Sequence, residues 1–196
     1  MKKALLATAF VPLIIGGCAG IQPKETLTET LETGGALKPE HQHINLEKAH
    51  LFFDINPEKR EVKGKTELVL SVTEKQSDFL IDFDNNYQIS ALSINSLKTN
   101  DYTHELGEIR FSLEQPIAAG DKLTVTIEYK GQPHVAINPP WDGGYVWDET
   151  ENGKPWIATA VQGEGCDLIW PCIDHPTFEA KQTDIVIRVP KGLVAA

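Results

Sequence analysis

The sequence predicts an all-β chain whose main part is an antiparallel β-sandwich or saddle-shaped β domain, preceded by a signal peptide and a flexible tether. Several short segments alternate apolar and polar residues with a period of two, as half-buried strands do. Turn-forming residues separate these segments, and no long stretch shows the 3.6-residue apolar period of a helix. Strands at this spacing without helices are typical of sandwiches and related β domains.

The first element is a targeting segment. Lys2 and Lys3 form a basic start, and residues 4–15 form an apolar stretch that is too short to cross a bilayer as a stable helix. The stretch ends in an aliphatic residue, two glycines and Cys18, the pattern of a bacterial lipobox. We predict a lipoprotein signal peptide at residues 1–17 and lipidation of Cys18; the alternative is an ordinary secretory signal with an incidental Cys.

Lipidation implies a membrane partner and a place in the bacterial cell envelope. Several acyl chains on one Cys give a stable anchor, whereas a single chain binds only marginally. Ala19, which follows the lipidated Cys, is not acidic, and this favours the outer membrane or the periplasmic face. Residues 18–45 are rich in Thr, Glu, Gly, Pro and Lys without apolar periodicity, so we predict a flexible linker in which His41 and His43 are solvated.

The predicted β domain covers residues 46–196, and its clearest strand is 122–130. Four side chains of that strand face one way: Leu123, Val125, Ile127 and Tyr129. Further strands are predicted at 49–55, 67–72, 78–83, 89–94, 108–113 and 184–189. After a turn at 190–192, residues 193–196 are predicted to begin another strand.

Residues 138–147 interrupt this pattern with two prolines, two glycines and three aromatic residues, Trp141, Tyr145 and Trp147. The aromatic side chains could cap one end of the sandwich or form the wall of a cleft. Capping is favoured, because large aromatic side chains most often serve burial.

The net charge of −10 excludes some partners. A chain this acidic has no electrostatic attraction for nucleic acid or for an anionic lipid surface. A cationic group, such as the amino terminus of a peptide, would be attracted instead.

Two cysteines remain after Cys18. In an oxidising compartment Cys166 and Cys172 could form a disulfide, but spacing alone does not show whether their Cα atoms come close enough, and we favour two buried free thiols. A zinc site on this pair would need two further ligands at suitable spacing. A nucleophilic Cys172 paired with His175 is disfavoured, because no helix N-terminus is present to lower the pKa of the thiol.

Gln162 and Glu164 are the remaining candidate site residues, since the chain contains no His-Glu-x-x-His motif. On a strand, side chains at positions i and i+2 point to the same face, and the neighbouring Gly163 and Gly165 would allow a ligand close to the backbone. A carboxylate beside an amide suits an ammonium group. The alternative, an exposed polar pair on an edge strand, is equally consistent with the residue chemistry.

Residues 46–196 resemble the amino-terminal β domain of the zinc aminopeptidase family that includes aminopeptidase N and leukotriene hydrolase. The resemblance is carried by the Gln162-x-Glu164 pair and by the turn Pro171-Cys172-x-Asp174-x-Pro176. It implies that Glu164 binds the free α-amino group of a peptide substrate and that Gln162 lines the pocket for the first side chain. It also implies a structural role for Pro171, Cys172, Asp174 and Pro176. Asp167 and Leu168 stand where the family usually has an Arg.

In that family the Gly-x-Met-Glu-Asn loop and the His-Glu-x-x-His helix follow this domain, and neither occurs here. The resemblance therefore implies no cofactor, no metal ligand and no catalytic residue in this chain. It implies zinc and a catalytic domain downstream as part of a full-length enzyme, and an N-terminal piece that is inactive alone. The alternative is a stand-alone β-sandwich lipoprotein that acts as a binding or scaffold module.

Overall fold

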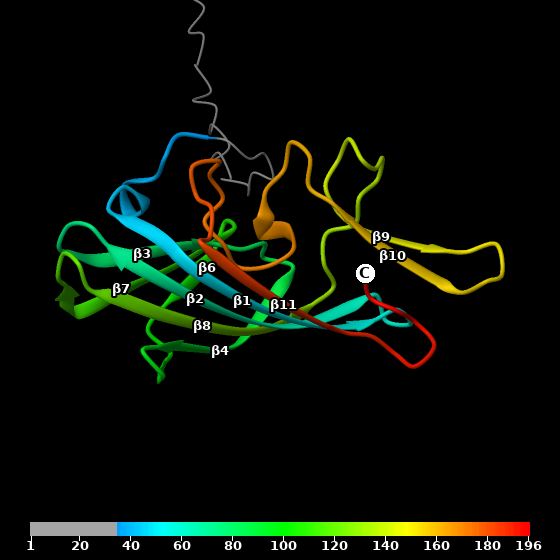
Figure 1. The fold of residues 1–196 in the computed structure, drawn as a ribbon, viewed down its shortest axis with the longest axis horizontal. Coiled ribbons are helices and arrows are strands. Elements are labelled where there is room, and N and C mark those ends of the chain that lie inside the picture. The colour runs from blue at the N-terminus through cyan, green and yellow to red at the C-terminus, as the bar shows by residue number, and fades with distance from the viewer. Residues whose placement is uncertain (1–34) are drawn as a thin grey trace, which may run out of the picture.

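The computed structural model describes residues 35–196, whose regular elements are strands apart from two short 3-10 helices (Figure 1). The predicted signal peptide at 1–17 and Cys18 lie outside the described residues. Within residues 35–196, no helix is long and apolar enough to cross a bilayer. The prediction of an all-β fold is confirmed.

A six-stranded sheet forms the largest part of the domain. Its strand order is β11-β1-β2-β8-β4-β5. The bounds are β1 Ile44–Asn56, β2 Glu61–Val72, β4 Tyr87–Ile94, β5 Leu97–Thr99, β8 Lys122–Gly131 and β11 Gln182–Arg188. All neighbouring pairs are antiparallel except β1 and β11, which run parallel. The expected sheet is therefore present, but it is not purely antiparallel.

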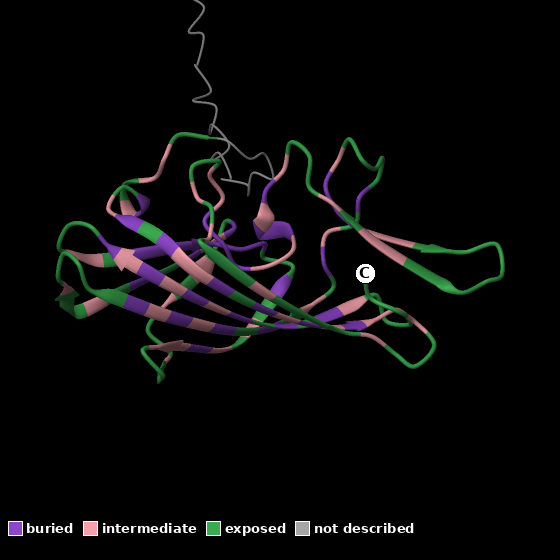
Figure 2. Ribbon diagram, in the orientation of Figure 1, coloured by how far each residue is buried: buried purple, intermediate pink, exposed green. Residues whose placement is uncertain are grey.

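Two smaller sheets complete the fold. A three-stranded sheet has the order β3-β7-β6, with β3 at Gln76–Asp82, β6 at Thr103–Glu105 and β7 at Glu108–Ile117. A hairpin of β9 (Gly144–Glu149) and β10 (Pro155–Ala160) projects from one end of the domain (Figure 1). One cluster of buried apolar side chains joins the six-stranded and three-stranded sheets, and Figure 2 shows the buried residues alternating along the strands.

Alternation along the strands explains this core. Leu123, Val125, Ile127 and Tyr129 of β8 are all buried, as predicted. Tyr129 also explains a glycine in β2, because a Cβ atom at Gly64 would lie 2.0 Å from the Tyr129 Cζ atom. The phenol ring therefore crosses the neighbouring strand where that strand has no side chain.

The last residues of the predicted linker, from the 3-10 helix at 39–41 to the start of β1 at Ile44, are part of the folded domain. A 3-10 helix at Pro39–His41 packs on the domain, and its first residue is a proline, which suits the first turn. His41 is 2% exposed, and one ring nitrogen lies 3.1 Å from the Leu80 carbonyl oxygen. The prediction that His41 is solvated is wrong, because the helix places it over the end of β3.

Other differences concern short or irregular elements. The short strands β5 and β6 and both strands of the β9–β10 hairpin were not predicted. Residues 193–196 form no strand, although Leu193 makes an isolated bridge with Lys191. Tyr145 is buried and stacks on Trp147, as core capping predicts, but Trp141 is 69% exposed, so capping is wrong for that residue.

Candidate functional site

Gln162 and Glu164 lie in a turn that follows β10, not on a strand. Gly163 has a φ angle of +79°, in the left-handed region that favours glycine, and the Glu164 amide donates to the Val161 carbonyl at 3.2 Å. The prediction that the pair shares one face of a strand is therefore wrong. β10 ends at Ala160, before both residues, and the positive φ of Gly163 forms the turn between them.

The Glu164 carboxylate is held by the backbone of a second loop. Its Oε2 atom accepts a hydrogen bond of 2.8 Å from the Gly143 amide. A Cβ atom at Gly143 would lie 2.4 Å from that oxygen, so no other residue fits there without a shift. Among the described residues, Oε1 accepts no hydrogen bond, and the exposed Gln162 side chain makes none. Within residues 35–196 the site therefore offers one carboxylate oxygen fixed by a backbone amide and a second oxygen without a hydrogen bond.

A disulfide closes the segment that follows. Cys166 and Cys172 are bonded, with their Cα atoms 6.2 Å apart. The favoured prediction of two free thiols is wrong. A 3-10 helix at Cys166–Leu168 and a turn fold the chain back, with the Ile169 and Trp170 amides donating to the Cys166 carbonyl. This local folding brings the two cysteines within bonding distance, which their spacing alone could not show.

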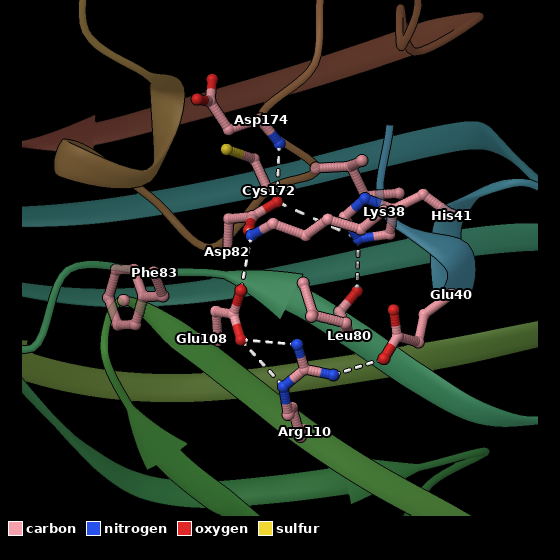
Figure 3. Close-up of polar contacts among 12 residues, drawn as sticks. Lys38, Glu40, His41, Leu80, Asp82, Phe83, Glu108, Arg110, Cys172 and Asp174 are labelled. Atoms are coloured by element: carbon pink, nitrogen blue, oxygen red, sulfur yellow. Dashed lines mark hydrogen bonds and ion pairs between the residues drawn. The ribbon is translucent and has the colours of Figure 1, made fainter. Parts of the chain in front are cut away.

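Asp82, at the end of β3, connects the turn to the core. Its backbone exchanges two hydrogen bonds with Cys172, of 2.8 and 3.0 Å, and its Oδ2 atom accepts one of 2.9 Å from the Asp174 amide. Of the prolines that flank the turn, Pro171 is buried and Pro176 is exposed. Cys172 thus pairs side by side with the last residue of β3, at the outer edge of the three-stranded sheet (Figure 3).

Lys38 reaches the same carboxylate from the N-terminal segment. Its Nζ atom lies 2.5 Å from Asp82 Oδ1 and 2.8 Å from Glu108 Oε1 (Figure 3). Burial of the amine opposes its charge, but the hydrogen bonds to the two carboxylates outweigh burial and raise the pKa of Lys38. Sequence reasoning missed both Lys38 and Asp82. A carboxylate inside the otherwise apolar run 79–83 was the available signal, since buried carboxylates are normally paired.

Asp167 is the other buried acid of this region. Burial raises its pKa to about 7, with further contributions from the Asp174 and Asp82 carboxylates. A Cβ atom at Gly165 would lie 2.1 Å from Asp167 Oδ1 and 2.4 Å from Asp174 Oδ2, so the two carboxyl groups lie on the same side of that glycine, in the space that a side chain would fill. A cavity of about 160 Å³ is lined by Asp82, Asp167 and Asp174 together with residues of the N-terminal segment. The burial of Asp167 does not follow from its neighbours in the sequence.

These acids do not make a metal site. Among the described residues, no three His, Cys, Asp or Glu side chains are arranged to hold a metal ion. Lys38 already neutralises Asp82, which leaves only Asp167 and Asp174 beside Gly165. The described residues therefore do not fit a zinc ion.

Comparisons with known proteins agree with the resemblance found in the sequence. The family model of the peptidase M1 N-terminal domain matches residues 38–196. The M1 zinc metallopeptidase from Deinococcus radiodurans aligns with a TM-score of 0.60 and 18% identity over 76% of this chain and 33% of that chain. Yeast LTA4 hydrolase in complex with bestatin aligns with a TM-score of 0.58 and 14% identity over 86% of this chain and 26% of that chain. A search of curated proteins found no match.

At these identities the structural likeness shows the fold alone, and the chain spans about a third or less of the length of the structures it matches. The family model is the stronger finding, because it matches well over half of the chain and includes every predicted site residue from Gln162 to Pro176. The chain therefore belongs to the peptidase M1 N-terminal domain family.

Proposed function

We propose that this chain is the part of a membrane-anchored zinc aminopeptidase that binds the amino terminus of a peptide substrate, while a downstream catalytic domain removes the first residue. Family membership supports the class of enzyme. One matched structure, a variant of the Deinococcus radiodurans metallopeptidase, is bound to a Tyr-Ser-Ala substrate. No zinc ligand set is present in residues 35–196, so we assign the metal and the bond cleavage to the catalytic domain.

The Glu164 carboxylate carries this proposal. The Gly143 amide fixes Oε2, and Oε1 remains available to accept a hydrogen bond from a substrate ammonium group. The exposed Gln162 amide lies two residues away, on the other side of Gly163, and supplies an orienting acceptor beside the first side chain. A carboxylate held before the ligand arrives loses little conformational entropy on binding, which favours recognition of a small cationic group.

The exposed apolar residues of the edge strand β11 are evidence for contact with a neighbouring domain. Three successive apolar residues of β11 are exposed: Ile185 by 57%, Val186 by 47% and Ile187 by 42% (Figure 2). Because successive residues of a strand face opposite sides, β11 exposes apolar side chains on both of its faces. A groove of about 630 Å³ runs between Ile185 and Ile187 and the β9–β10 hairpin, and its lining includes the apolar side chains of Trp156 and Val194. Exposed apolar surface of this extent marks an interaction site. We assign it to the catalytic domain.

The test compares the protein expressed from the complete reading frame with residues 19–196 alone, using aminoacyl 4-nitroanilides. The longer protein should hydrolyse these substrates in a zinc-dependent manner, and residues 19–196 should not. Glu164→Gln should lower kcat/KM by about 100-fold, since loss of one partner of a desolvated charge pair costs several kcal/mol. Glu151→Gln, in the exposed tip of the β9–β10 hairpin, is the matched control and should leave kcat/KM unchanged.

Two results would contradict the proposal. The first is no hydrolysis by the longer protein with zinc present. The second is hydrolysis that Glu164→Gln leaves unchanged, which would remove the role of Glu164 while keeping the enzyme class. An N-acetylated substrate, which lacks the ammonium group, should be a poor substrate for the unaltered enzyme and should not be affected further by Glu164→Gln.

Membrane attachment is a separate part of the proposal. We assign residues 1–17 to a lipoprotein signal peptide and Cys18 to the lipidation site, because an apolar stretch followed by small residues and Cys is the pattern of a lipobox. The peptidase would then act in the cell envelope, outside the cytoplasm. Radiolabelled palmitate should be incorporated into the unaltered protein and not into Cys18→Ser. Equal labelling of both proteins would contradict the assignment.

A further inference from the structure

The loop between β8 and β9 has a fixed shape at the point where it reaches Glu164. The Asp142 carboxylate accepts hydrogen bonds from the Ile137 and Asn138 amides, of 2.8 and 2.5 Å, and the Trp141 amide donates to the Asn138 carbonyl at 3.0 Å. Side chain and backbone therefore close residues 137–142 into a compact turn. Figure 1 shows this loop next to the segment that follows β10.

Gly143 joins this turn to the receptor carboxylate. Its amide donates to Glu164 Oε2, and its Cα atom is too close to the Glu164 side chain to carry a Cβ atom. Trp141 is two residues from Gly143, so their Cα atoms are at most about 7 Å apart. An indole side chain starting from that position is long enough to reach the space beside the carboxylate.

The turn exposes apolar side chains that no described residue covers. Trp141 is 69% exposed and Ile137 is 88% exposed. An exposed Trp on a turn with fixed hydrogen bonds presents a large apolar surface to a ligand or to another domain. The alternative of core capping is excluded by the exposure of Trp141.

The chemistry of an amino acid connects these two features. In a peptide amino terminus, the ammonium nitrogen and the side chain are bonded to the same Cα atom, so they lie about 2.5 Å apart. A site that binds the ammonium group at Glu164 must therefore place the first side chain within a few ångströms of that carboxylate. A rigid apolar wall at this distance favours a large apolar or aromatic side chain.

Resting on the proposed aminopeptidase function, we propose that the 137–143 turn forms this wall and that Trp141 selects substrates whose first residue is large and apolar. The Gly143 amide holds the wall and the ammonium receptor at a fixed separation, so recognition of charge and of side chain is coupled. Trp141 acts as a specificity-determining residue and takes no part in bond cleavage.

The experiment measures kcat/KM of the protein from the complete reading frame with the 4-nitroanilides of Leu, Phe and Ala. Trp141→Ala should lower kcat/KM for Leu and Phe by about 10-fold or more and for Ala by less than about 3-fold, because a hydrophobic pocket discriminates by the apolar contact it makes. Trp141→Phe should restore most of the preference. Leu97→Ala, at an equally exposed position on β5, is the control and should leave all three values unchanged.

The outcomes separate this inference from the function on which it rests. No hydrolysis of any anilide by the unaltered protein would overturn the proposed function and this inference together. Hydrolysis with an equal loss on all three substrates in Trp141→Ala would overturn the inference alone and indicate that Trp141 packs against the catalytic domain. Unchanged kinetics in Trp141→Ala would also overturn it, while the proposed function would stand.

Discussion

The six-stranded sheet and the disulfide-closed segment 161–178 are stabilised by different interactions. In the sheet, side chains such as Leu68, Leu70 and Leu123 are fully buried against one another in regular alternation. In the segment there is little regular structure, and a disulfide, hydrogen bonds to Asp82 and a few buried side chains hold the chain in place. A buried apolar side chain can be replaced by another of similar volume at a small cost in stability. A hydrogen bond or a disulfide is lost altogether when one of its two partners is replaced.

This difference predicts where the domain is sensitive and to what. Loss of apolar volume should weaken the sheet under all redox conditions and at all pH values. The segment should respond to reduction and to pH, because it contains the Cys166–Cys172 bond and the buried Asp167. The candidate site lies in the second region, so conditions that leave the fold intact could still change the site.

The largest effect is expected in the sheet. Leu68→Ala removes a fully buried side chain at the centre of β2, and should lower the free energy of unfolding by about 3 kcal/mol, through lost apolar burial and the cavity left behind. Urea denaturation followed by circular dichroism measures this loss. Leu97→Ala, at a position that is 75% exposed, should change it by less than about 0.5 kcal/mol. Equal losses in both variants would show that β2 is not the core strand described here.

A smaller and more local effect is expected for the disulfide. Replacing both Cys166 and Cys172 by Ser opens a short loop, and should lower the free energy of unfolding by about 2.5 kcal/mol. Hydrogen exchange should lose protection in residues 161–178 while the amides of β1, β2 and β8 keep theirs. The unaltered protein under reducing conditions should show the same pattern. A uniform loss of protection would contradict the separation of the two regions.

The smallest effect should depend on pH. The folded-state pKa of Asp167 is raised to about 7, so between about pH 4 and pH 7 the native state binds more protons than the unfolded state. The stability that Asp167 contributes is therefore present at low pH and is lost as pH rises through 7. A pKa raised from about 4 to about 7 corresponds to at most about 4 kcal/mol, and local rearrangement and water around the ionised carboxylate relieve part of that cost. Asp167→Asn, which stays neutral, should therefore match the unaltered protein near pH 4 and exceed it by about 2 kcal/mol at pH 8.

The measurement is the difference between the two unfolding free energies at each pH. His41, whose pKa is lowered by burial and which has no interaction with Asp167, is present in both proteins and cancels in that difference. The neighbouring carboxylates of Asp174, Asp82 and Asp84 repel ionised Asp167, and the difference includes the loss of this repulsion in Asp167→Asn. A difference that does not change between pH 4 and pH 8 would show that Asp167 does not titrate in this range.

The sequence predicts the two regions unequally well. Seven strands follow from their apolar pattern, and in β1, β2, β7 and β8 that pattern records one buried face. β11 was predicted too, although most of its residues are exposed. Strands β5 and β6 are too short for such a pattern, and the β9–β10 hairpin carries few buried residues. Parallel pairing of β11 with β1 depends on contacts between distant segments, which alternation does not reveal.

In the site, residue types were easier to predict than geometry. Gln162 and Glu164 stand out by their glycine neighbours, but the turn conformation depends on Gly163, and the partner of Glu164 is a backbone amide of another loop. The disulfide was missed because a 3-10 helix and a turn set the distance between its cysteines. Lys38 was missed because its partners, Asp82 and Glu108, are far away in the sequence.

The parallel pairing of β1 with β11 has a consequence for how the chain folds. Asp54 of β1 and Arg188 of β11 are register partners that also form an ion pair across a separation of 134 residues. During synthesis the ribosome must release nearly the whole domain before β11 can cover that edge of β1. Contacts this distant in sequence form slowly, since a long loop must close first. Until then the outer edge of β1 remains an unpaired strand, the kind of surface on which chaperones and neighbouring chains act.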